Sequence, residues 1–248
     1  MPTIKDVAGL AGVSIGTVSN FINNTRPVSR ETAAKVKDAI EVLNYTPNMS
    51  ARNLKANITS DIGLIIPSFN DTYYVQVFQG IECAFQNSEY SVHLSFSNDI
   101  PDLEDKIARE YLERRVSGLI LISCQPDQWR FYYNNFTSRG IPIVLIDRDI
   151  RGLDTSLVTF DNHAIICQMC HALLAEGKQN LVLISGPEKF DCEARCINGF
   201  KEAHSKMEVP LTKDAVVNCN MSKEEAFRRT LQMFRTNKPD AIISTSES

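Results

Sequence analysis

The stretch TIKDVAGLAGVSIGTVSNFIN, residues 3–23, determines how the chain begins to fold. Thr3 and Asp6 form a capping-box pattern, which predicts the start of a helix. Gly12 predicts the end of that helix, because glycine adopts the left-handed conformation that other residues resist. Ser14 is placed to cap a second helix only two residues later. The sequence therefore predicts two short helices joined by a tight turn.

A third predicted helix completes this small amino-terminal module. Ser29 is placed to cap it, and Ala33, Val36, Ile40 and Leu43 recur at helical spacing. The two helices before it, with so tight a turn, are typical of a helix-turn-helix, whose second helix can enter the major groove of DNA. The pattern alone is also consistent with a three-helix module that binds no nucleic acid.

Charge is distributed unevenly along the chain. The 248 residues carry a net charge of −4, yet residues 1–60 hold seven Lys and Arg against four Asp and Glu, a net of +3. The remaining residues therefore carry −7. A small basic end on an acidic body suggests that only this end meets a polyanion, although surface charge often serves solvation alone.

The composition is that of an ordinary globular protein, with 43% hydrophobic and 23% charged residues. We find no secretory signal and no apolar run long enough to span a membrane, so we expect a cytoplasmic protein. Seven cysteines, an odd number, are expected to be reduced and buried. The pairs Cys167–Cys170 and Cys192–Cys196 leave a zinc or redox site as the less favoured alternative.

Residues 46–55, TPNMSARNLK, read as a linker with some helical character. Pro47 suits the first position of a helix, and Ala51 and Leu54 are spaced to share one face. A helix this short is marginal in water unless something covers its apolar side. A plain linker with one isolated leucine is the alternative.

From Asp61 onward, short apolar runs alternate with helical stretches. The runs are rich in β-branched residues and predict strands at 62–67, 92–96, 118–123, 143–146, 181–185, 215–218 and 241–244. The helical stretches lie near 73–87, 102–115, 128–139, 162–176, 192–205 and 223–236. The order restarts after residue 161, which predicts two successive α/β lobes with parallel sheets covered on both faces.

The sequence carries no signature of an enzyme. No Gly-x-Gly-x-x-Gly follows a predicted strand, and no Gly-Lys-Ser/Thr phosphate loop, nucleophile–base–acid set or metal cluster is visible. In open parallel sheets, ligands bind outside the carboxyl ends of the strands. Those ends carry polar and aromatic residues here, which suits a hydroxylated small molecule and requires no cofactor.

The amino-terminal sequence resembles the signature of the lactose/galactose (LacI/GalR) repressor family. The resemblance rests on residues 3–23 and on VSRETAAKVKDAIEVLNYTPNMSARNLK, residues 28–55. It implies an all-α helix-turn-helix domain followed by a periplasmic-binding-protein-like α/β region, a doubly wound parallel sheet in two lobes. The implied divisions are a DNA-binding domain at 1–46, a hinge at 47–58, a first lobe at 59–160 and a partial second lobe at 161–248.

In that family the start of the second helix reads bases, which implies base contacts by Ile15, Gly16 and Asn20. Gly16 offers no side chain, so direct readout is expected to be sparse. Hydrogen bonds to phosphates, which set register, are implied for Thr3, Ser14, Thr17, Ser19, Asn23 and Tyr45. Helix capping is the alternative role for Ser14 and Thr17.

In the hinge, the resemblance implies that Leu54 wedges between base steps in the minor groove. Ala51 shares its face, and Lys55 is implied to reach the minor groove or a phosphate. For the small-molecule site the resemblance implies aromatic stacking by two tyrosines and polar contacts by residues at strand ends. These residues are Tyr73, Tyr74, Asp147, Arg148, Asp161 and Glu247. For each of them a surface turn is the alternative.

The sequence departs from the family pattern in two places. Cys196 stands where the family commonly has an arginine, and Arg195 lies one residue early, which puts its role and an anionic ligand in doubt. Lys189 is a weaker substitute. The sequence ends soon after the run at 241–244, whereas the family continues, so we expect an incomplete second lobe in which ligand binding and dimerisation could fail.

The resemblance implies a homodimeric repressor that binds a near-palindromic operator. A small-molecule effector, expected to be a sugar or a sugar derivative, would bind between the lobes and stabilise or melt the hinge. The direction of control is open. The alternatives are a small-molecule-binding α/β protein without an operator, and a fragment that folds only at its amino end.

Overall fold

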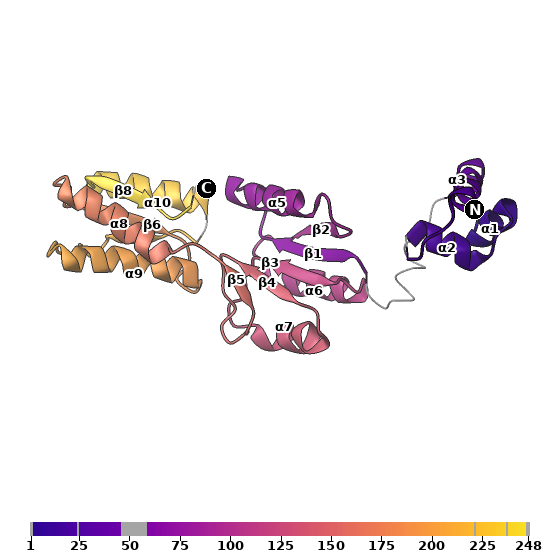
Figure 1. Ribbon diagram of the computed structural model, residues 1–248. Coiled ribbons are helices and arrows are strands. Elements are labelled where there is room, and N and C mark those ends of the chain that lie inside the picture. The colour runs from indigo at the N-terminus through magenta and orange to yellow at the C-terminus, as the bar shows by residue number, and fades with distance from the viewer. Residues whose placement is uncertain (1, 24, 46–58, 221, 237, 247–248) are drawn as a thin grey trace. The chain divides into compact units, whose positions relative to one another are not determined.

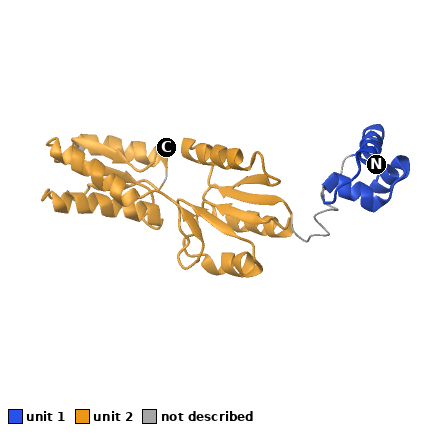
Figure 2. Cartoon of the chain, in the orientation of Figure 1, with its two compact units in different colours: residues 1–57 blue, residues 58–248 orange. Residues whose placement is uncertain are grey.

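The computed structural model describes residues 2–23, 25–45, 59–220, 222–236 and 238–246. The chain divides into two compact units, residues 1–57 and 58–248 (Figure 2). The described part of the first unit is helical, and the second contains the described strands (Figure 1). The predicted hinge contacts Ala51, Leu54 and Lys55 lie outside the described residues.

The described part of the first unit contains three helices: α1 (Ile4–Ala11), α2 (Ile15–Asn23) and α3 (Arg30–Leu43). Their core is made of small and β-branched side chains, with Val7, Val18 and Val36 fully buried. On α3 the structure buries Ala39 and leaves Ala33, predicted on the buried face, only half-buried. The unit therefore has its own hydrophobic core.

The predicted helix ends of this unit are confirmed. The Thr3 backbone N–H and hydroxyl both donate to the Asp6 carboxylate, at 2.7 and 2.8 Å. Gly12, at φ 66°, ends α1 in the left-handed conformation. The hydroxyl of Ser29 accepts a hydrogen bond from the backbone N–H of Thr32 at 3.2 Å and so caps α3. These caps satisfy backbone groups that the helices leave open.

The first lobe of the second unit is built on a five-stranded parallel sheet in the order β2-β1-β3-β4-β5. Its strands are β1 (Asp61–Ile66), β2 (Ser91–Phe96), β3 (Gly118–Leu121), β4 (Ile143–Ile146) and β5 (Ser156–Val158). Its helices are α5 (Thr72–Phe85), α6 (Pro101–Glu113), α7 (Trp129–Asn135) and a 3-10 turn, η1 (Thr137–Arg139).

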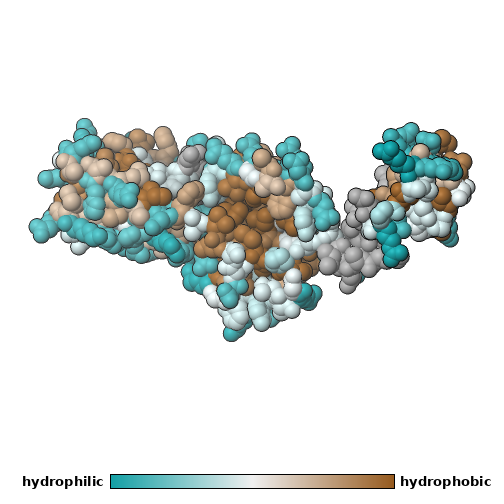
Figure 3. Space-filling model, in the orientation of Figure 1, coloured by the Kyte–Doolittle hydropathy of each residue, from teal (hydrophilic) through white to brown (hydrophobic). Residues whose placement is uncertain are grey.

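Alternate residues of β1 point to opposite faces of this sheet, as a strand requires. Ile65 packs with residues of α6 and α7, including Tyr111 and Tyr132. Leu64 packs on the other face, in a cluster that includes Tyr74 of α5. Helices therefore lie on both faces of the sheet, as predicted (Figure 1). In Figure 3 apolar side chains gather over the strands of this lobe.

The second lobe has a three-stranded parallel sheet in the order β7-β6-β8. The strands are β6 (Leu181–Ser185), β7 (Val216–Asn218) and β8 (Ala241–Ser244), and the helices are α8 (Asn162–Ala175), α9 (Asp191–Lys206) and α10 (Lys223–Thr236). A Cβ added at Gly199 of α9 would lie 2.4 Å from the carbonyl oxygen of His163 in α8. These two helices thus meet backbone against backbone.

The α/β fold predicted from the sequence is confirmed, with two local differences. β5 was not predicted: it has three residues, of which Ser156 and Val158 are exposed, and it lies at the sheet edge. The helix predicted over 128–139 is divided at Phe136, which ends α7, precedes η1 and buries its ring in the core. Among the described residues, no helix is long and apolar enough to cross a bilayer.

Candidate functional site

The amino end of α2 presents a small exposed surface. Ile15 is 45% exposed, and Gly16 beside it is exposed as well. The hydroxyl of Ser14 accepts a hydrogen bond from the Thr17 backbone N–H at 3.1 Å, and the two hydroxyls lie 2.9 Å apart. The predicted capping role of Ser14 is therefore confirmed. The arrangement leaves an apolar side chain free to contact an outside partner.

Further along α2, polar side chains hydrogen-bond to each other. The side-chain amide of Asn23 donates to the hydroxyl of Ser19 at 3.2 Å. The hydroxyl of Thr25 donates to the side-chain oxygen of Asn20 at 3.0 Å, so that oxygen already accepts a hydrogen bond within the unit. Tyr45 is half-buried against the core of the unit. Local hydrogen bonds thus involve four of the predicted contact residues: Thr3, Ser14, Ser19 and Asn23.

A pocket in the second unit, here called the inner pocket, lies where strand ends of both lobes meet. Its volume is about 250 Å³. This is slightly below the range of about 300–1,000 Å³ that is usual for small-molecule sites. Its described lining is aromatic, acidic and thiol-bearing: Asp71, Tyr73, Tyr74, Asp147, Phe160, Asn162, Cys192, Glu193, Cys196, Thr245 and Ser246. Such a lining offers stacking surfaces and hydrogen-bond acceptors to a small ligand.

A second, outer pocket of about 690 Å³ adjoins it and shares Asp71 and Tyr74. Its lining comes from the loops after β1 and β2 and the start of α5 in the first lobe, and from Ser222 and the start of α10 in the second. The lining residues are Pro67, Ser68, Asn70, Asp71, Thr72, Tyr74, Asn98, Asp99, Ser222, Lys223 and Glu224. Because it is mostly polar, this pocket is suited to be the solvated entrance to the inner one.

A buried carboxylate, Glu193, and a half-buried one, Asp147, dominate the electrostatics of the inner pocket. Glu193 of α9 is only 4% exposed and accepts hydrogen bonds from the Gly186 backbone N–H and the Thr245 hydroxyl, both at 2.8 Å. Burial raises the pKa of Glu193, and these two hydrogen bonds offset the rise only in part. Burial also raises the pKa of Asp147, against the opposing effects of Arg148 and of a hydrogen bond from Cys192.

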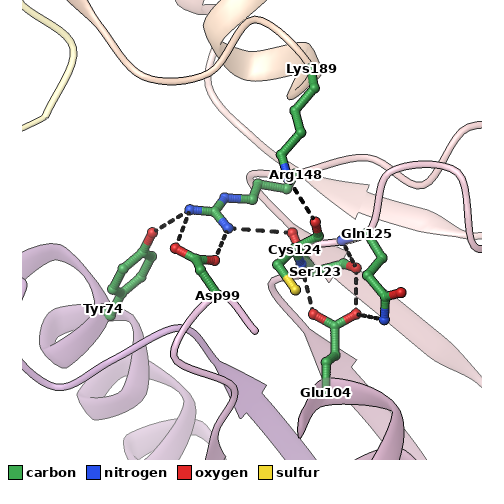
Figure 4. A network of polar contacts seen from close by, with 8 residues as sticks. All are labelled: Tyr74, Asp99, Glu104, Ser123, Cys124, Gln125, Arg148 and Lys189. Carbon is green, nitrogen blue, oxygen red and sulfur yellow. Dashed lines mark hydrogen bonds and ion pairs between the residues drawn. The ribbon is translucent and has the colours of Figure 1, made fainter. Parts of the chain in front are cut away.

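Arg148 lies behind this pocket in a polar network (Figure 4). Its side chain is 1% exposed, and its guanidinium donates to the Asp99 carboxylate at 2.5 Å and to the Tyr74 hydroxyl at 3.0 Å. The guanidinium carbon also lies 4.1 Å from the centre of the Phe190 ring. Arg148 is therefore held by partners within the chain and does not belong to the pocket lining.

A buried carboxylate in the first lobe supports the same network. Glu104 is fully buried and accepts hydrogen bonds from the hydroxyls of Ser123 and Tyr132 and from the backbone N–H of Cys124, at 2.7 to 2.8 Å. It holds the end of β3 in place, directly beside the Ser123 carbonyl oxygen that faces Arg148 at 3.4 Å (Figure 4). Its role is structural, since all these partners belong to the chain.

The structure separates the site residues predicted from the sequence into groups. Tyr73, Tyr74 and Asp147 line the inner pocket, and the two tyrosine rings lie 5.4 Å apart, edge to face. Asp161 is exposed and caps α8 by accepting from the Ala164 backbone N–H at 3.1 Å. The structure places Arg195 outside the pocket lining, where it is exposed and paired with Asp191 at 2.6 Å. Glu247 lies outside the described residues.

Several lining residues were not predicted from the sequence. Cys192, Glu193 and Cys196 project from one side of α9, whereas Arg195 projects from another, which explains why Cys196 lines the pocket and Arg195 does not. Lys189 also lies outside the lining, and its ammonium group donates to the Cys124 carbonyl oxygen at 3.5 Å. Among the described residues, no group of three or more His, Cys, Asp and Glu side chains could hold a metal ion.

Comparison with known proteins assigns both units. Residues 3–48 match the profile of "Bacterial regulatory proteins, lacI family", and residues 62–248 match "Periplasmic binding protein domain". The HTH-type transcriptional repressor PurR of Actinobacillus pleuropneumoniae serotype 5b (strain L20) is 31% identical over 255 residues, which cover 100% of this chain and 74% of the relative. Catabolite control protein A of Staphylococcus xylosus is 29% identical over 245 residues, with 99% and 74% covered.

The fold is also that of solved structures of transcriptional regulators. A lac repressor dimer bound to operator and the anti-inducer ONPF aligns with a TM-score of 0.83 at 24% identity, over 98% of this chain and 73% of that one. A complex of the transcriptional regulator CelR with cellobiose aligns with a TM-score of 0.65 at 23% identity, over 98% and 74%. The regulator Cra of Pseudomonas putida, in complex with fructose 1-phosphate, gives 0.67 at 23% identity, over 75% and 69%.

Proposed function

Because the chain belongs to the LacI family of bacterial regulatory proteins, we propose that it represses transcription by binding an inverted-repeat operator as a homodimer. The observation that carries this proposal is the first unit, a capped three-helix module whose sequence matches the family profile and whose α2 begins with the exposed Ile15. The related PurR is a transcriptional repressor, and the chain is a regulator rather than an enzyme. We propose that it acts in the bacterial cytoplasm, where operator DNA lies.

In this proposal the start of α2 enters the major groove. Ile15 contacts a thymine methyl group, Asn20 donates to a base, and Gly16 lets the helix approach closely. Phosphate contacts that set the register come from Thr3, Ser14, Thr17, Ser19, Asn23 and Tyr45. Ala51, Leu54 and Lys55 complete the interface in the minor groove.

The second unit is proposed to bind the effector in the inner pocket. Tyr73 and Tyr74 offer aromatic surfaces, and Asp147 offers acceptors, which suits a hydroxyl-bearing ligand such as a sugar. Asp161 and Glu247 remain proposed contacts to the effector. For Arg148 we propose an indirect role through Tyr74 and Asp99, while a contact by Arg195 would require it to leave Asp191.

Effector binding at the junction of the lobes is proposed to act on DNA affinity through the segment that joins the two units. Such coupling is allosteric, since each ligand changes the affinity for the other by the same factor. The proposal fixes the two sites and leaves the sign of the coupling to experiment.

The test is a selection of bound duplexes from a random pool by the purified chain, followed by an anisotropy titration of the selected duplex against a scrambled one. We expect an inverted repeat to be enriched. Its binding constant should fall steeply with salt, by a log–log slope of about −0.9 for each phosphate neutralised. Equal affinity for selected and scrambled duplexes would contradict operator binding.

A further inference from the structure

We infer that the effector of the inner pocket carries no phosphate or carboxylate group and is an uncharged or cationic, hydroxyl-rich compound. This inference rests on the proposed function, because it concerns the same effector site. It narrows the ligand from sugars and sugar derivatives in general to those without an anionic group.

The lining of the inner pocket is acidic. It contains the carboxylates of Asp71, Asp147 and Glu193, and none of its described residues is Lys, Arg or His. Asp71 is the N-cap of α5 and accepts from the Tyr73 backbone N–H at 2.9 Å. Asp147 and Glu193 come from opposite lobes, so a ligand between them faces a carboxylate on either side.

The thiols on α9 do not compensate this charge. Cys192 and Cys196 are buried, and both line the pocket. Burial raises the pKa of Cys196 to about 12, and it raises the pKa of Cys192 as well, so both thiols are neutral. A neutral thiol is only a weak hydrogen-bond donor, and it cannot hold a phosphate as a guanidinium does.

Arg148 is the nearest buried cation, and its positive charge is already balanced by an ion pair with Asp99. The Asp99 carboxylate lies 2.5 Å from one of its terminal nitrogens, and the other donates to Tyr74. The Phe190 ring covers one face of the guanidinium. Only Nε has no hydrogen-bond partner in the chain. Arg148 could therefore donate one hydrogen bond, whereas its charge is balanced by Asp99.

Two lysines lie nearby, and neither faces the inner pocket. Lys189 contacts the Cys124 carbonyl oxygen, and its ammonium lies 4.8 Å from the centre of the Phe190 ring. Lys223 lines the outer pocket, whose lining also contains Asp71, Asp99 and Glu224. An anion that entered would pass this acidic rim and then meet two more carboxylates in the inner pocket.

This arrangement selects a ligand by its donors and its charge. Carboxylates only accept hydrogen bonds, so hydroxyl or ammonium groups of a ligand complete their hydrogen bonding. A phosphate offers mainly acceptors at neutral pH and would place like charges close together in a poorly hydrated space. The pocket therefore rejects anions and holds a polyol, a sugar or an amino sugar.

The native thiols allow the charge preference to be measured without knowing the ligand. The purified chain is treated at pH 8 with either 2-(trimethylammonium)ethyl or 2-sulfonatoethyl methanethiosulfonate, in both of which a thiol forms a mixed disulfide and methanesulfinate leaves. Rates at Cys192 and Cys196 are followed by peptide mass spectrometry. Each rate is divided by the rate at which the same reagent modifies 2-mercaptoethanol. The exposed Cys83 serves as the surface control.

We expect the cationic reagent to be favoured about tenfold or more at Cys192 and Cys196 compared with Cys83, because the described pocket lining holds carboxylates and no cationic side chain. Asp147→Asn should reduce this preference at both thiols. Cys196→Arg should abolish it at Cys192, while the matched control Cys196→Ser should retain it.

An equal or faster rate with the anionic reagent would overturn the inference. Failure of both reagents to modify either thiol would overturn it as well, since the carboxylates would then not face a pocket open to charged solutes. No step of this measurement involves DNA. A chain that binds no operator can still show the charge preference, and an operator-binding chain can lack it, so the two proposals fail separately.

Discussion

The guanidinium carbon of Arg148 lies 4.1 Å from the centroid of the Phe190 ring, so a charged side chain of the first lobe stacks on an aromatic ring of the second. Arg148 follows β4, and Phe190 immediately precedes α9. The same lobe boundary is crossed by a hydrogen bond from Arg151 to the Lys189 carbonyl oxygen at 3.0 Å. The segment before α9 is thus fixed to the first lobe next to the inner pocket.

Arg148→Met should destabilise the second unit strongly. It retains an unbranched side chain against Phe190 but removes the buried partner of Asp99. Breaking a buried ion pair costs about 3–5 kcal/mol, and we expect about 3 kcal/mol because Asp99 is partly exposed. The measurement is the free energy of unfolding in urea. Arg151→Met, which breaks the exposed pair with Asp127, is the matched control and should cost far less. Equal losses would contradict this prediction.

Gly199→Ala should also be destabilising, because the new methyl group would meet the His163 carbonyl oxygen at 2.4 Å. Overpacking of this kind costs about 1–3 kcal/mol. Gly80 of α5 has nothing within 4 Å of the equivalent position, so Gly80→Ala should stabilise by about 1 kcal/mol through helix propensity. Thermal and urea unfolding followed by circular dichroism would show the opposite signs. If Gly199→Ala left the stability unchanged, α8 and α9 would be able to separate at little cost in free energy.

Ile15→Ala should weaken binding to the selected operator without changing stability. Loss of one base contact costs about 1–3 kcal/mol, and we expect the lower half of that range for a thymine methyl contact. Affinity for scrambled duplex should stay constant, since phosphate contacts are retained. Val42→Ala, at a 75% exposed position on α3, is the control and should leave both affinities unchanged. Anisotropy titrations check this, and equal losses on both duplexes would remove Ile15 from base readout.

Stability should depend on pH through Glu193. Its pKa is raised by burial above the ordinary value of 4.5, so its favourable contribution is complete below pH 4.5 and is lost as pH rises through the folded-state pKa. The difference in unfolding free energy between wild type and Glu193→Gln should therefore shift in favour of the variant from pH 4 to pH 8. Urea unfolding across this range is the measurement.

Glu202 supplies the control of opposite sign. Its pKa is lowered, chiefly by a hydrogen bond from Lys206, so its contribution is present above pH 4.5 and is lost as pH falls. The free energy of unfolding of Glu202→Gln should therefore fall relative to that of wild type as pH rises toward neutrality. If both variants followed the same trend, burial would not raise the pKa of Glu193.

Much of the fold could be predicted because local signals coincide with the element ends. The run at 143–146 lies between Pro142 and a left-handed Asp147, and the run at 181–185 ends before Gly186 and Pro187. The exposed edge strand β5 gave no such signal, because Ser156 and Val158 are not patterned for burial. Its place is set by pairing with β4.

The pocket was harder to predict, because burial of polar residues depends on distant partners. Nothing near Arg148 in the sequence indicates that Asp99 would neutralise it, since 49 positions separate them. Glu193 resembles any helical glutamate until the phase of α9 is known. The signal that could have found it was the spacing of Cys192 and Cys196, which marks an inward side of the helix and places Arg195 away from it.

The close approach of Gly199 to His163 has a mechanical consequence. Gly199 lies about one helical turn beyond Cys196, so the stretch of α9 that bears the pocket residues is clamped to α8 with no side chains between them to yield. Packed backbones of this kind tilt together as a block and do not bend. We therefore expect an occupied pocket to change the orientation of the whole second lobe about the connection between β5 and α8, through which the chain enters that lobe.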